Sequence, residues 1–225
     1  MYIVKENSSS SESPLFINLK DSYGSSESEE TFLISDIKIA KAVFEKGFSN
    51  KALINWCIEN FMKDKHNFID INAGFGEFTL HLAKGMKKTY TFEHNLKSYA
   101  CLVSNLVLHN LSDKVVALPF KLSDTTSFKD SQRGLTYKLD DLPFPLFGEN
   151  SPIGFIRTPG NKSIIEGAKE TLIKNNLPPI LFTIEETNIA AVASKKELFE
   201  YLESLKYKIV VINGIKDTFL AVKSE

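Results

Sequence analysis

Cysteine, excess charge and long apolar runs are scarce in this chain, and each scarcity excludes something. The two cysteines, Cys57 and Cys101, lie far apart and outside any Cys-x-x-Cys pattern, so we expect buried thiols and no disulfide. No apolar run is long enough to span a bilayer. The formal net charge of −1 over 225 residues gives no general attraction to nucleic acid or anionic lipid. These absences favour an ordinary globular protein that contacts neither membranes nor polyanions.

The N-terminal region lacks the features of an exported protein. Residues 1–6 carry neither the apolar core nor the small-residue cleavage site of a secretory signal, so we expect a cytoplasmic location. Serine and glutamate clusters then frame a short β-prone piece, Leu15–Leu19. We therefore predict a flexible arm over residues 1–31 and one domain over residues 32–225.

The most informative stretch is Phe68–Phe78. An apolar run with an acid, Asp70, leads into a turn of small residues, and an amphipathic helix follows at once. About 20 residues beyond this loop, Glu93 closes a second apolar strand, where a carboxylate can accept hydrogen bonds from both hydroxyls of a ribose. This order and spacing predict a site for an adenosine-bearing cofactor.

The turn differs from the dinucleotide-binding pattern because Phe78 occupies the place of its third glycine. It reads Asp70-x-Asn72-x-Gly74-x-Gly76, which resembles the first motif of class I S-adenosylmethionine (SAM) methyltransferases. The chain from roughly Ile34 to its C-terminus resembles more narrowly the FkbM family, whose members mostly methylate hydroxyls of sugars and natural products. The segments that carry the resemblance are Phe68–Phe78, Thr91–Asn95, Tyr99–Asn110, Lys121–Asp124, Tyr137–Leu142 and Gly154–Leu172.

The resemblance implies SAM as the cofactor, bound at the carboxyl ends of the strands. It implies that the loop shapes the methionine side of the site, that Glu93 holds the ribose, and that Ser123 or Asp124 lies near the adenine. The residues expected to bind the cofactor are Asp70, Asn72, Ala73, Gly74, Gly76, Glu93, His94, Ser123 and Asp124. The implied acceptor is a hydroxyl on a small molecule or glycan.

The pattern of elements agrees with that fold. Strand and helix patterns alternate from Phe68 onward, which predicts a parallel sheet. A last helix, Lys195–Leu205, precedes two apolar runs that are separated by Asn213-Gly214, a strong hairpin signal. We predict an α/β, Rossmann-like class I methyltransferase fold with a mostly parallel seven-stranded sheet and a C-terminal antiparallel hairpin. We expect the looser segment Asp124–Asn150 to form a flap on the acceptor side.

Two residues depart from the family pattern. Asn72 replaces a glycine, and we expect the turn to survive because asparagine tolerates positive φ. Thr158 replaces the acid that should face the active site, so no carboxylate remains in the turn 157–161. Its neighbour Arg157 either holds an anionic group or, as we prefer, covers the sheet with its stem.

Hydroxyl methylation needs a group that takes the acceptor's proton. The candidates are His94, Asp124 and Glu185 or Glu186, and His94 is the most natural base near neutral pH. His94 has a plainer alternative as an exposed loop histidine. None of the four histidines is spaced with cysteines or acids as a metal site requires, so we expect no metal. Two other functions remain: a SAM-binding protein that has lost catalysis, and nucleic-acid methylation, which the neutral charge disfavours.

Overall fold

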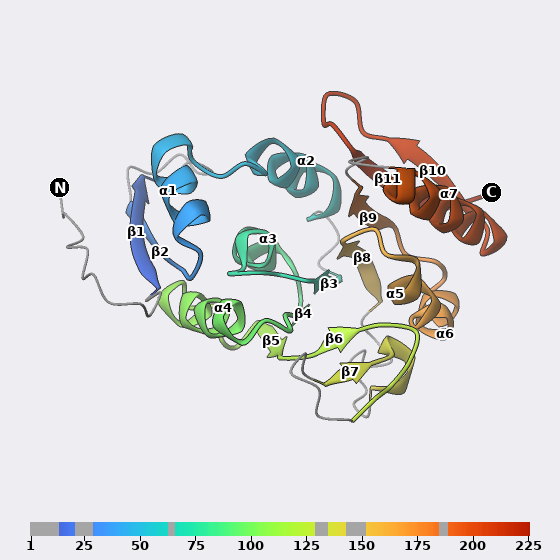
Figure 1. Cartoon of the computed structure of the whole chain (residues 1–225), viewed down its shortest axis with the longest axis horizontal. Helices are drawn as coiled ribbons and strands as arrows, with labels where there is room; N and C mark the ends of the chain where they lie inside the picture. Colours follow the sequence, from blue (N-terminus) through green and yellow to red (C-terminus); the bar gives the residue numbers. More distant parts are fainter. Residues whose placement is uncertain (1–13, 21–28, 63–65, 129–134, 143–151, 185–188) are drawn as a thin grey trace.

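The computed structural model describes residues 14–20, 29–62, 66–128, 135–142, 152–184 and 189–225. A seven-stranded sheet runs through the middle of the molecule in the order β10-β11-β9-β8-β3-β4-β5 (Figure 1). No helix in these ranges is both long and apolar enough to cross a membrane. The strands of this sheet are β3 (Asn67–Ile71), β4 (Thr89–Phe92), β5 (Val115–Leu118), β8 (Ile153–Thr158), β9 (Ile180–Thr183), β10 (Tyr207–Val211) and β11 (Thr218–Lys223).

The strand directions confirm the predicted fold. The neighbours β5, β4, β3, β8 and β9 pair in parallel, whereas β11 pairs antiparallel with both β9 and β10. Every residue of β3 is buried, as expected for a central parallel strand with both faces covered. Because parallel strands end at the same edge, the residues that follow β3, β4, β5 and β8 are brought together there.

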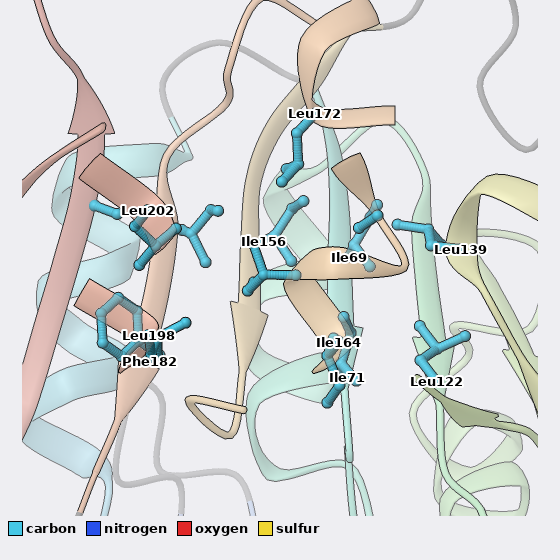
Figure 2. Close-up of a cluster of buried hydrophobic side chains, with 14 of the residues drawn as sticks. Ile69, Ile71, Leu122, Leu139, Ile156, Ile164, Leu172, Phe182, Leu198 and Leu202 are labelled. Atoms are coloured by element: carbon cyan, nitrogen blue, oxygen red, sulfur yellow. The ribbon is translucent and has the colours of Figure 1, made fainter. Parts of the chain in front are cut away.

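One face of the sheet is covered by α5 (Lys162–Glu166), α6 (Lys169–Lys174) and α7 (Ile189–Ser204). Their apolar side chains meet those of β3, β8 and β9 in the cluster drawn in Figure 2. The short strands β6 (Lys121–Leu122) and β7 (Thr136–Tyr137) and the 3-10 turn η2 (Leu139–Asp141) complete this layer, through Leu122 and Leu139. The described part of the expected acceptor flap is therefore packed onto the core, and its residues 129–134 and 143–150 lie outside the described ranges.

Between Lys162 and Lys174 the chain forms two helices, α5 and α6, rather than one. The break has a tertiary cause. A Cβ at Gly167 would lie 1.8 Å from the carbonyl oxygen of Ser123, so the chain passes too close there for any side chain. Asp140 bonds to the backbone on both sides of this break. Its backbone N–H donates to the Gly167 carbonyl, and its carboxylate accepts from the N–H groups of Glu170 and Thr171. The last helix, α7, begins at Ile189 rather than at Lys195.

The opposite face is covered by α2 (Lys51–Phe61), α3 (Glu77–Leu82, followed by the 3-10 turn η1, Ala83–Gly85) and α4 (Leu96–Leu108). A second, two-stranded sheet of β1 (Leu15–Lys20) and β2 (Glu29–Ile34) packs outside α4, together with α1 (Ile37–Lys46). Asp36 caps α1 by accepting from the N–H groups of Lys38 and Ile39. Figure 1 shows this hairpin at the opposite end of the molecule from α7 and β10.

The N-terminal hairpin corrects where ordered structure begins, which we expected near Phe32. The β-prone piece Leu15–Leu19 forms β1, which lies inside the predicted arm, and β2 runs through the predicted boundary between residues 31 and 32. Ile17, Phe32 and Ile34 are buried in one cluster with residues of α3 and α4. Burial of this apolar face against the helices explains why the segment folds although its flanks are rich in serine and glutamate.

Candidate active site

The loop between β3 and α3 forms the centre of the site. Asn72, Gly74 and Gly76 have φ values of 59°, 61° and 99°, a region that glycine enters freely and asparagine tolerates. The replacement of glycine by Asn72 is therefore compatible with the turn, as predicted. A Cβ at Gly74 would meet nothing within 4 Å. The outer side of the loop is consequently open at Gly74, and a ligand can approach the backbone there.

Glu93, at the end of β4, closes the site beside this loop. Its side chain is buried, with 5% of the residue exposed. One carboxylate oxygen accepts from the N–H of Gly74 at 2.8 Å and the other from the N–H of Asn95 at 2.7 Å. Each carboxylate oxygen can accept more than one hydrogen bond, so both retain capacity for the hydroxyls of a ribose. The carboxylate thus fixes the loop and fits the role that the sequence predicted for it.

Asp70 lies beneath the loop and is fully buried. Its two oxygens accept from the Thr79 hydroxyl at 2.6 Å and from the Arg157 guanidinium at 2.7 Å. Arg157 also stacks its guanidinium on the Phe78 ring, 4.1 Å from the ring centroid. The anionic partner of Arg157 is therefore a carboxylate of the protein itself, and this ion pair anchors the end of β3 to β8. The predicted contact between Asp70 and the cofactor remains a prediction.

Glu77 is a site residue that the sequence did not single out. It is the first residue of α3, and its carboxylate accepts from the backbone N–H of Asn50 at 3.2 Å and from the Asn50 side-chain amide at 2.9 Å. Burial raises the pKa of Glu77, while the hydrogen bonds from Asn50 oppose that shift. The contact joins the start of α2 to the end of the loop between β3 and α3. The sequence signal that could have identified Glu77 is its position as a charged residue directly after Gly76.

His94 follows Glu93, and its side chain is 37% exposed. Its Nδ1 lies 3.7 Å from a Glu93 carboxylate oxygen, which is too long for a hydrogen bond. Asn95 then caps α4 by accepting from the N–H groups of Lys97 and Ser98. The histidine is thus held beside the predicted ribose carboxylate, partly open to solvent.

Ser123 and Asp124 follow β6 and lie against the start of α5. The Ser123 hydroxyl donates to Asp124 at 2.9 Å and lies 3.4 Å from the Ser163 hydroxyl. Ser163 also contacts Asn161, the N-cap of α5. The segment after β5 and the turn after β8 are thereby brought together, as the parallel sheet predicted.

Thr158 ends β8 and is 3% exposed. Its hydroxyl oxygen has no hydrogen-bond partner among the residues that the structure describes. A buried hydroxyl without a partner is costly, so this oxygen is a candidate to contact a ligand. The other base candidates, Glu185 and Glu186, lie outside the described residues.

Comparisons with known proteins give the fold. No protein-family model matches the sequence, and no functionally curated protein matches it significantly. Among solved structures, the methyltransferase FkbM from Methylobacillus flagellatus KT superposes with a TM-score of 0.52 at 17% identity, over 70% of this chain. The O-methyltransferase from Bacillus cereus, in complex with SAH, gives 0.52 at 18% identity, over 76% of this chain and 79% of its own.

Neighbours with other acceptors match equally well. A putative rRNA methylase from Clostridium thermocellum has a TM-score of 0.50 at 16% identity and covers 77% of this chain and 95% of its own. This chain spans 43% of the length of the FkbM methyltransferase. At such identities the structural neighbours establish a class I methyltransferase fold, and the reaction must be argued from the site.

Proposed function

We propose that this protein binds SAM at the carboxyl edge of its sheet and transfers the methyl group to a hydroxyl of a small molecule or glycan. The observation that carries this proposal is the pairing of the open loop at Gly74 with the buried carboxylate of Glu93. Two neighbouring parallel strands hold these elements, which supports a site that needs little rearrangement to bind a ligand. Structural neighbours with bound SAH support the choice of cofactor.

Different residues would bind different parts of SAM. The loop Asn72–Gly76 would hold the amino-acid end of SAM, Glu93 would accept from the ribose hydroxyls, and Ser123 with Asp124 would lie toward the adenine. SAM supplies an activated methyl group, so the protein mainly needs to align the acceptor and accommodate its proton. Tight anchoring of the loop by Glu93, Asp70 and Arg157 suits that task because misalignment is costly in rate.

The proton acceptor would be His94. Histidine is a common general base, and the position of His94 directly after Glu93, with Nδ1 3.7 Å from that carboxylate, supports a place beside the bound cofactor. Asp124, whose carboxylate is occupied by Ser123, is the next candidate. Thr158, buried and without a described partner, would then contact the acceptor or the cofactor rather than take the proton.

Loss of catalysis is the second candidate, and Thr158 favours it. The turn 157–161 carries no carboxylate, so a protein that binds SAM without transferring its methyl group would have this sequence. Methylation of nucleic acid is a weaker alternative: rRNA methylases are among the structural neighbours, but the net charge of −1 offers no general attraction to a polyanion.

Isothermal titration calorimetry with SAM and SAH tests the proposal. We expect binding, and we expect Glu93→Ala to weaken it by about 2–3 kcal/mol because a charge-assisted pair of acceptors is lost. Glu200→Ala, at an exposed position on α7, is the matched control and should bind normally. Absence of heat with saturating SAM, together with a thermal shift on adding NAD, would show that the cofactor is wrong.

A further inference from the structure

The backbone polar groups on the outer edge of β2 bond to side chains at the C-terminal end of α4 rather than to another strand. The amide of Asn105 donates to the Leu33 carbonyl at 2.9 Å and accepts from the Leu33 N–H at 2.7 Å. One helical turn later, Nε2 of His109 lies 3.0 Å from the Thr31 carbonyl. Since a carbonyl can only accept, Nε2 carries the hydrogen in this contact. The side chains of Asn105 in α4 and of His109, the C-cap residue of α4, thus take the place of a neighbouring strand.

Asn105 makes one more bond, and that bond reaches the cofactor loop. Its amide also donates to the Phe75 carbonyl at 2.9 Å. Asn105 is fully buried, so water cannot replace any of these bonds. Packing follows the same route: Phe48, which follows α1, stacks on Phe75 with ring centroids 6.2 Å apart, and Ala73 belongs to the same buried cluster as Phe32.

We infer that Asn105 is a positioning residue that makes the shape of the cofactor loop depend on the docked N-terminal hairpin. The hairpin fixes the Asn105 amide through both polar groups of Leu33, and the fixed amide fixes Phe75 between Gly74 and Gly76. Neither Asn105 nor Leu33 needs to touch the ligand. For its effect on SAM the inference rests on the proposed function, whereas its effect on the loop does not.

The test combines hydrogen exchange of the free protein with SAH titration. Asn105→Asp keeps the acceptor for Leu33 N–H but removes both donated bonds. We expect the amides of Gly74 and Gly76 to exchange about ten-fold faster and the SAH dissociation constant to rise about ten-fold, as for loss of a buried hydrogen bond. Asn175→Asp is the matched control, because the amide of this C-cap residue makes a local bond, to the Thr171 carbonyl of α6. Amides of β9 serve as the internal reference for general stability.

A second variant approaches the same contact from the strand. Leu33→Pro removes the N–H that donates to Asn105, together with the half-buried leucine side chain, and it places no charge in the core. It should also speed exchange in the loop, which lies far from residue 33 in sequence. If Asn105→Asp does not fold, this variant alone decides the question.

The possible results distinguish the positioning role of Asn105 from the proposed function. Loop exchange that rises in both folded variants, with unmutated protein that binds no SAH, would retain the positioning role and reject the proposed function. Loop exchange unchanged in the folded variants would overturn the positioning role. Equal acceleration in the loop and in β9 would overturn it as well, because the effect would then be a general loss of stability.

Discussion

At the scale of single residues, the site is built from charges that are already paired. Asp70 is neutralised by Arg157, and each oxygen of Glu93 is held by a backbone N–H. Thr158 contrasts with them, because its buried hydroxyl has no described partner. If SAM binds as proposed, these fixed charges would hold it without reorganising, and the Thr158 hydroxyl would be left for the reacting partners.

His94 gives the sharpest prediction at this scale. If it takes the acceptor's proton, His94→Ala should lower the turnover rate about 100-fold or more while SAH affinity stays nearly unchanged. The rate of the unmutated protein should fall in acid, because a protonated imidazole cannot take the acceptor's proton. Steady-state rates across pH, with calorimetry on both proteins, measure these effects.

His66→Ala is the control, because His66 lies just before β3, at the opposite edge of the sheet from the site. Equal turnover of the unmutated protein and His94→Ala on a confirmed acceptor would eliminate this base and direct attention to Asp124, Glu185 and Glu186. A protein that binds SAM and transfers nothing to any hydroxyl acceptor would support the catalytically impaired alternative.

At the scale of elements, helix ends are set by neighbours that are distant in sequence. Asp140 in η2 caps α6 across a separation of about thirty residues, whereas Asp36 caps α1 locally. The local cap could be read from the sequence, since aspartate directly precedes the helix. The tertiary cap could not, and the α5–α6 break went unpredicted for that reason.

Asp140→Ala tests the tertiary cap. We expect a loss of about 1 kcal/mol in the free energy of unfolding, because the N–H groups of Glu170 and Thr171 lose their acceptors. Asp140→Asn should retain part of that stability, since asparagine is also a good cap. Urea unfolding at constant m-value reports the change, and Glu203→Ala on the exposed side of α7 should have little effect. Equal midpoints for Asp140→Ala and the unmutated protein would refute the cap.

At the scale of the whole molecule, a buried histidine links hairpin docking to pH. His81 on α3 is 5% exposed and lies against the rings of Phe32 and Phe48. Burial lowers its pKa below 6.5, and the nearby charges act against one another: Glu30 raises the pKa, whereas Lys84 and His109 lower it. The folded protein therefore binds fewer protons than the unfolded chain just below pH 6.5.

The sign of the effect follows from that difference. Stability should be unaffected by His81 above pH 6.5 and should fall as the pH drops below it, because unfolding then takes up a proton. His81→Gln cannot take up that proton, so the stability of the unmutated protein relative to this variant should decrease from pH 7 to pH 5. Glu77, whose raised pKa gives the opposite dependence, is common to both proteins and cancels. A difference that stays constant in urea unfolding at the two pH values would contradict this prediction.

The sequence by itself determined the sheet and the glycine-containing turn after β3. Alternating apolar patterns gave the strand and helix order, Asn213-Gly214 gave the final hairpin, and the spacing from Gly74 to Glu93 predicted two groups that meet in the structure. These signals are local, because each depends on periodicity or turn chemistry within a short stretch. The tolerance of Asn72 for positive φ is equally a property of the residue itself.

Only the tertiary structure decided what holds that loop. Asn105, Glu77 and Arg157 find their partners 27 to 87 residues away in sequence, so no local pattern reveals the pairing. The hairpin of β1 and β2 folds because α4 covers one edge and buries one face, which the serine-rich flanks do not indicate. Polar groups that are buried must be paired, and the identity of each partner is fixed only when the packed chain brings the two together.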